Sequence, residues 1–114
     1  MSKYAVGIDI GGTTTKFGIV DRDGKILNQN RIPTNAQETV QGFIGDLFEK
    51  ISPMIQQTGG VSQFAGIGVG APNGNYYTGN IEHAANLKWK GIVPLASMIQ
   101  EKFGMRVKLT NDAN

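Results

Sequence analysis

The stretch from Tyr4 to Val20 reads YAVGIDIGGTTTKFGIV and decides the fold of this 114-residue chain. Two apolar segments, residues 4–8 and residues 17–20, flank a pair of adjacent glycines. Apolar segments on either side of a glycine pair predict a strand, a tight turn and a second strand. The polar residues near the glycine pair then lie together at one end of this hairpin. They are Asp9, Thr13, Thr14, Thr15 and Lys16.

The glycine pair, Gly11 and Gly12, has two interpretations from the residues alone. An ordinary hairpin turn accounts for two glycines between apolar strands. A phosphate-binding turn also accounts for them, because glycines let the backbone approach a ligand and leave N–H groups pointing outward. The spacings of a Walker A loop and of a dinucleotide fingerprint are both absent. The neighbouring hydroxyls and Lys16 suit a phosphate, and the Asp9 carboxylate suits a divalent cation.

The rest of the sequence predicts the order β-β-β-α-β-α-β. The expected strands are residues 3–10, 16–21, 25–32, 64–70 and 106–110, and the expected helices are residues 36–58 and 94–103. Thr34 or Asn35 is the expected N-cap of the first helix, and Pro53 is expected to kink it or to start another. Pro94 and Gly104 are expected to bound the second helix. This order predicts an α/β fold in which a three-strand meander is followed by parallel strands.

Three polar segments follow predicted strands at their carboxyl ends. They are residues 9–15, residues 72–75 and residues 111–112. Ligands of open α/β sheets collect at the carboxyl ends of the strands. We therefore expect the three segments to form one site, with plain loops as the alternative.

Composition excludes several classes of protein. The net charge is only +2 and the basic residues are scattered, so no basic face indicates nucleic-acid binding. No apolar run approaches the length of about 20 residues that a membrane span needs, and no signal peptide is visible. The chain has no cysteine, which excludes disulfides and thiolate metal sites within it. We expect a cytoplasmic protein that binds neither nucleic acid nor membrane.

Four segments resemble motifs of the ROK family of bacterial sugar kinases and related regulators. Residues 9–13, followed by Gly18, resemble its first phosphate motif. The others are GIGVGAPNG at residues 66–74, NLKWKGIVPL at residues 86–95 and TNDAN at residues 110–114. They occur in the family's order and cover the whole chain. The resemblance implies the actin-like ATPase (ribonuclease H-like) fold, with a mixed five-stranded sheet, a three-strand antiparallel meander and flanking helices.

The resemblance also implies glucokinase-like, ATP-dependent phosphorylation of a hexose hydroxyl. Asp112 would be the general base that accepts the proton of the attacking hydroxyl, and Asp9 would face Mg²⁺ through water. The residues placed at the nucleotide phosphates are Asp9, Gly11, Gly12, Thr13 and Lys16. The residues placed at the sugar are Pro72, Asn73, Gly74, Asn86 and Asn111. The identity of the sugar does not follow from these residues.

Several assignments have an alternative. Asp112 could cap a following helix, which is a common use of aspartate. Asn86 is equally suited to a turn. Trp89 could be a stacking platform for a ligand or the anchor of a loop, and we favour the anchor. His83, the only histidine, has no partner visible in the sequence, so we expect a loop or surface position rather than a base or a metal ligand.

The sequence departs from the family pattern in two residues and in length. Many members carry lysine where this chain has Thr14, and glutamate is usual where Thr110 stands. The family runs to about two domains of this size. We therefore expect residues 1–114 to be a single N-terminal lobe without the second lobe and its zinc site, and we expect a homodimer for the full-length protein.

A rival function is a ROK-type transcriptional regulator or sugar sensor without catalysis. Such regulators usually carry a helix-turn-helix ahead of the first strand. Only eight residues precede Asp9 here, and both Asp9 and Asp112 are present. These two observations favour the kinase.

Overall fold

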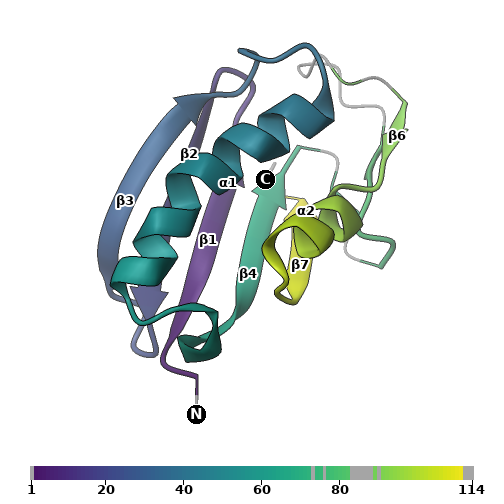
Figure 1. Cartoon of the computed structure of the whole chain (residues 1–114). Helices are drawn as coiled ribbons and strands as arrows, with labels where there is room; N and C mark the ends of the chain where they lie inside the picture. The colour runs from purple at the N-terminus through teal and green to yellow at the C-terminus, as the bar shows by residue number, and fades with distance from the viewer. Residues whose placement is uncertain (1, 73, 76, 83–88, 90, 112–114) are drawn as a thin grey trace.

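The computed structural model describes residues 2–72, 74–75, 77–82, 89 and 91–111. Five strands form a mixed sheet in the order β3-β2-β1-β4-β7 (Figure 1). Their bounds are β1 Tyr4–Ile10, β2 Thr14–Asp21, β3 Ile26–Pro33, β4 Phe64–Ala71 and β7 Val107–Asn111. The first three strands pair antiparallel, and β4 pairs parallel with both β1 and β7. The predicted meander and mixed five-stranded sheet are confirmed.

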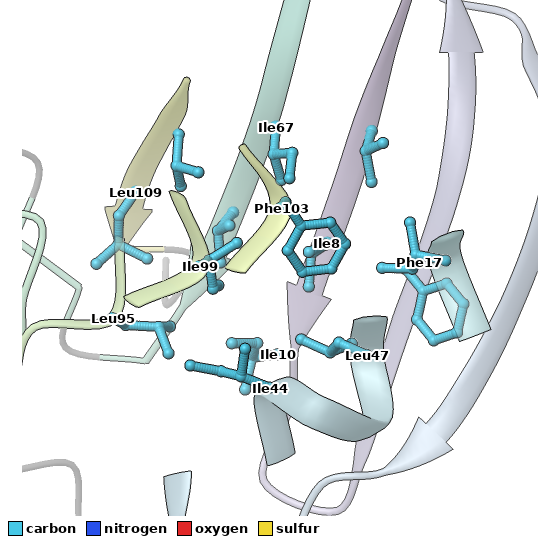
Figure 2. Close-up of a cluster of buried hydrophobic side chains, with 14 of the residues drawn as sticks. Ile8, Ile10, Phe17, Ile44, Leu47, Ile67, Leu95, Ile99, Phe103 and Leu109 are labelled. Atoms are coloured by element: carbon cyan, nitrogen blue, oxygen red, sulfur yellow. The ribbon is translucent and has the colours of Figure 1, made fainter. Parts of the chain in front are cut away.

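Helices α1 (Val40–Gln57) and α2 (Leu95–Phe103) lie on the same face of the sheet (Figure 1). In β1, Ile8 and Ile10 are buried while Asp9 between them is exposed. This period-two alternation is the pattern of a strand with one covered and one open face. Figure 2 shows the core between the sheet and the helices. Its labelled side chains are Ile8, Ile10, Phe17, Ile67 and Leu109 from the strands, and Ile44, Leu47, Leu95, Ile99 and Phe103 from the helices.

Helix α1 begins four residues later than predicted. The Oγ1 atom of Thr39 accepts a hydrogen bond from the N–H of Gly42 at 3.0 Å, so Thr39 is the N-cap. The prediction that Thr34 or Asn35 caps this helix is wrong, because both residues bind the β1–β2 turn instead. The helix continues through Pro53 to Gln57.

Helix α2 begins and ends close to the predicted positions. Pro94 occupies its N-cap position, and Gly104 ends it in the left-handed conformation at φ 68°. The N–H of Gly104 donates to the carbonyl of Gln100 at 2.9 Å, which satisfies one of the last carbonyls of the helix. None of the helices described is both long and apolar enough to cross a membrane.

A second sheet of two short strands was not predicted. Strands β5 (Ile81–Glu82) and β6 (Ile92–Val93) pair antiparallel. Two-residue strands are too short to show a hydrophobic period, so sequence patterning does not detect them.

The open face of the sheet carries a row of glycines. Gly18, Gly7 and Gly68 lie at the same register on β2, β1 and β4. A Cβ atom added at Gly18 would lie 2.6 Å from the carbonyl oxygen of Asn28 on β3, whereas one added at Gly7 or Gly68 meets no described atom within 4 Å. The close approach of β3 therefore requires glycine at position 18 and not at position 7.

The Gly7–Gly18 pair offers a matched test of this packing. Gly18→Ala should lower the free energy of unfolding by about 1–3 kcal/mol, because its methyl group collides with β3. Gly7→Ala should leave that free energy unchanged or raise it by up to about 1 kcal/mol, since alanine restricts the unfolded chain. Urea denaturation of both variants measures the difference, and equal effects would contradict the described packing.

Candidate functional site

The carboxyl ends of β1, β4 and β7 lie at the same edge of the sheet. Asp9 pairs with Lys16 on β2 and with Gly70 on β4, and Gly70 pairs with Thr110 on β7. With strands about 4.8 Å apart, the Cα atoms of Asp9 and Thr110 are separated by about 10 Å. Asp9, Lys16 and Thr110 are all exposed. A carboxylate, an ammonium and a hydroxyl thus lie in one row across the open face.

The loop after β4 packs against the end of β7. The N–H of Gly74 donates to the carbonyl of Ala71 at 3.2 Å, and Gly74 forms an isolated antiparallel bridge with Ile81. A Cβ atom at Gly74 would lie only 2.6 Å from the carbonyl oxygen of Thr110. Glycine at this position therefore lets the loop lie directly on the β7 backbone, next to Asn111. The half-buried Pro72 begins the same loop.

The β1–β2 turn is closed by its own backbone. The N–H of Gly11 donates to the carbonyl of Thr14 at 3.0 Å. A Cβ atom at Gly11 would lie 2.8 Å from that oxygen, so the turn requires glycine there. This bond corrects one detail of the sequence prediction, because the N–H of Gly11 is not available to a phosphate. In the described part of the chain, the N–H groups of Gly12 and Thr13 donate to no atom.

The carbonyl groups of the turn are held by the segment between β3 and α1. The three bonds are Thr34 Oγ1 to Gly11 O at 2.8 Å, Asn35 Nδ2 to Gly12 O at 2.7 Å, and Thr34 N to Thr13 O at 2.9 Å. All three donors come from two consecutive residues. The turn is therefore held from one side, although the sequence assigned those residues to a helix cap.

A buried pair of threonines supports the contact between the β1–β2 turn and the segment that follows β3. The Oγ1 atoms of Thr15 and Thr34 lie 2.8 Å apart, and both residues are completely buried. They are the two fully buried polar residues in the described core. One signal in the sequence could have indicated that Thr34 contacts the turn. Thr34 directly follows Pro33, the last residue of β3, and Pro33 pairs with Thr14 at the start of β2.

Trp89 anchors its loop to helix α1. Its ring lies 4.6 Å from the ring of Phe43 at an interplanar angle of 48°, and it is 5% exposed. A buried ring in contact with the core is not an open stacking platform, so the favoured interpretation of Trp89 is confirmed. Within the part of the chain that the structure describes, its buried Nε1–H has no hydrogen-bond partner.

Three of the predicted site residues, Asn73, Asn86 and Asp112, lie outside the described residues, and so does His83, which we expected in a loop or at the surface. Asn111 is placed by its backbone, which pairs with Ala71 at the end of β4. The structure thus brings together the β1–β2 turn, the loop after β4 and the end of β7.

The contact between the loop and β7 is tested by Gly74→Ala. The added methyl group would collide with the carbonyl of Thr110, so we expect the free energy of unfolding to fall by about 1–3 kcal/mol. The NMR amide signals of Thr110 and Asn111 should shift at the same time. Gly45→Ala is the control, because a Cβ at Gly45 in α1 meets no described atom within 4 Å. Unchanged signals in Gly74→Ala would contradict the contact.

Curated relatives match nearly the whole chain. The glucokinase of Halalkalibacterium halodurans is 34% identical over 116 aligned residues, which cover 98% of this chain and 34% of that protein. The xylose repressor of Caldicellulosiruptor bescii is 28% identical, and the match covers 96% of this chain and 28% of the repressor. The chain therefore spans about a third of the length of the relatives it matches.

The structure resembles a solved ROK family glucokinase from Streptomyces griseus in complex with glucose and AMPPNP. The TM-score is 0.76 at 27% identity, and the match covers 97% of this chain and 34% of that one. The ROK family model matches residues 5–114. Together with the sheet order and the convergent strand ends, these matches show that the chain belongs to the ROK family and has its actin-like ATPase fold.

Proposed function

We propose that residues 1–114 form the N-terminal lobe of an ATP-dependent hexose kinase and provide its phosphate turn and its general base. The observation that carries the proposal is the pair of unbonded N–H groups at Gly12 and Thr13, at the sheet edge that Asp9 and Thr110 share. The Streptomyces griseus relative holds glucose and AMPPNP, an analogue of ATP. That complex supports ATP as the phosphoryl donor of this protein.

The phosphate oxygens would bind at the β1–β2 turn. Gly12 and Thr13 would donate their backbone N–H groups, and the exposed Thr13 side chain adds a hydroxyl. Lys16 pairs with Asp9 across β1 and β2 and is exposed on the same face, so it would add positive charge near this edge. Fixed N–H dipoles next to a cation are a typical arrangement for binding a phosphate.

The residues of this edge fit a magnesium ion held together with the nucleotide. The described residues contain no group of three or more His, Cys, Asp or Glu that could hold a metal alone. Mg²⁺ needs no such group, because it usually keeps several waters and binds one or two carboxylates together with substrate phosphates. The exposed Asp9 carboxylate is suited to that role. When bound, the ion would neutralise charge on the phosphates during transfer.

The sugar would bind between the loop after β4 and the end of β7. Asn111 follows Thr110 at this edge, and Gly74 lies against the same backbone. Pro72, Asn73 and Asn86 would complete the contacts with the sugar hydroxyls. Asp112, which follows next in the sequence, would accept the proton of the attacking hydroxyl. Phosphoryl transfer depends mainly on positioning and charge stabilisation, so it asks little of the base and a carboxylate is sufficient.

A ROK-type regulator is the second candidate. The 28% identity to the xylose repressor of Caldicellulosiruptor bescii favours it, because that match covers 96% of this chain. A regulator needs sugar binding and no proton acceptor. The presence of both Asp9 and Asp112 in the sequence supports the kinase over this alternative.

The kinase proposal is tested by a coupled assay of the full-length protein against a panel of hexoses. We expect ATP-dependent turnover of at least one hexose, and we expect Asp112→Asn to lower kcat by about 10²–10⁴-fold, because it removes the general base. Asp23→Asn, in the exposed turn between β2 and β3, is the matched control and should retain full activity. Activity that survives Asp112→Asn contradicts the base, and sugar binding without any turnover favours the regulator.

The lobe proposal predicts a second result. The 114-residue chain alone should phosphorylate glucose far more slowly than the Halalkalibacterium halodurans glucokinase, because it spans about a third of that enzyme's length. The same coupled assay with equal concentrations of both proteins measures the ratio. A comparable rate would show that residues 1–114 contain a complete active site.

A further inference from the structure

We propose that Thr15, Thr34 and Asn35 are positioning residues, which fix the peptide groups of the β1–β2 turn so that its N–H groups face the phosphate. The inference deepens the proposed function and rests on it for the identity of the ligand. None of the three residues needs to touch that ligand. Their contacts with the turn carry the argument.

The hydroxyl groups of the two threonines form consecutive hydrogen bonds, and the donor of each bond can be assigned. A hydroxyl has a single hydrogen, and that of Thr34 is donated to the carbonyl of Gly11 at 2.8 Å. Thr15 must therefore be the donor in its 2.8 Å contact with Thr34. Both side chains are completely buried, so water does not compete for the bond between them, and the bond from Thr34 to Gly11 is partly buried. Consecutive hydrogen bonds of this kind polarise one another.

The orientation of the turn peptides follows from the same contacts. In a trans peptide group, the C=O of one residue and the N–H of the next point in opposite directions. The carbonyls of Gly11 and Gly12 point at Thr34 and Asn35. The N–H groups of Gly12 and Thr13 therefore point away from the β3–α1 segment. Neither of these N–H groups has a partner within the described part of the chain, and successive outward N–H groups form an anion-binding concavity.

Asn35 is oriented by its bond to the turn. Its Nδ2 donates to the carbonyl of Gly12 at 2.7 Å, while its buried Oδ1 has no hydrogen-bond partner among the described residues. A buried acceptor without a partner is unfavourable. The bond to Gly12 is thus the one side-chain bond in the described chain that fixes this amide, and it requires asparagine's N–H₂ group.

The test removes the Thr34 hydroxyl from the ¹⁵N-labelled chain. In Thr34→Val, the loss of the hydrogen bond to the Gly11 carbonyl should speed hydrogen exchange of the Gly11 N–H about tenfold or more. The amide signals of Gly12 and Thr13 should shift, and inorganic tripolyphosphate should bind about tenfold more weakly. Thr34→Ser, which keeps the hydroxyl, should restore all three measurements.

Thr58→Val is the matched control. The Oγ1 of Thr58 donates to the carbonyl of Met54 at 2.7 Å at the end of α1, so this variant loses the same kind of bond away from the turn. It should change neither the turn signals nor tripolyphosphate binding. If Thr34→Val does not fold, Asn35→Ala provides the same test through the amide signal of Thr13.

Each outcome decides the proposal. Unchanged Gly11 exchange and unchanged amide signals in a folded Thr34→Val variant would overturn it, and so would equal changes in Thr58→Val. In the Asn35→Ala test, a shifted Thr13 signal supports the proposal and an unshifted one overturns it. If the turn changes as expected but the wild-type chain binds no tripolyphosphate, the positioning role is supported and the phosphate role is contradicted.

Discussion

The hydrogen bonds that hold the carbonyl groups of the β1–β2 turn are the interaction on which the proposed site depends. Buried or half-buried carbonyls need partners, and here two consecutive residues after β3 provide all of them. Because the carbonyls of Gly11 and Gly12 are held from one side, the N–H groups of Gly12 and Thr13 are directed to the other. A turn that could have been an ordinary hairpin connection thereby becomes suited to an anion.

The parallel pairing of β1, β4 and β7 places the other candidate groups beside this turn. Parallel neighbours end at the same edge of a sheet, so residues far apart in sequence, such as Asp9 and Thr110, lie in one row. Gly74 then lets the loop after β4 lie on the last residues of β7. The helices cover only the opposite face, which leaves Asp9 and Lys16 exposed.

Much of this arrangement could be predicted from the sequence, because it depends on strong local patterns. The apolar segments that flank the glycine pair, the helical spacing of the residues that α1 and α2 bury, and Gly104 as a helix end all have local physical causes. The convergence of the strand ends followed from a general rule for α/β sheets. The N-cap was mistaken because Thr34, Asn35 and Thr39 are all chemically able to cap. The tertiary structure decides which carbonyl or N–H each of these side chains bonds, and the local sequence does not contain that information.

A structure of the full-length protein with AMPPNP and Mg²⁺ is the most direct test of the proposal that the β1–β2 turn binds phosphate. The account predicts phosphate oxygens about 3 Å from the backbone N–H groups of Gly12 and Thr13, with the carbonyls of Gly11 and Gly12 still bound to Thr34 and Asn35. Phosphates bound elsewhere, for example along the helix-covered side of the sheet, with the turn N–H groups left to solvent, would contradict it.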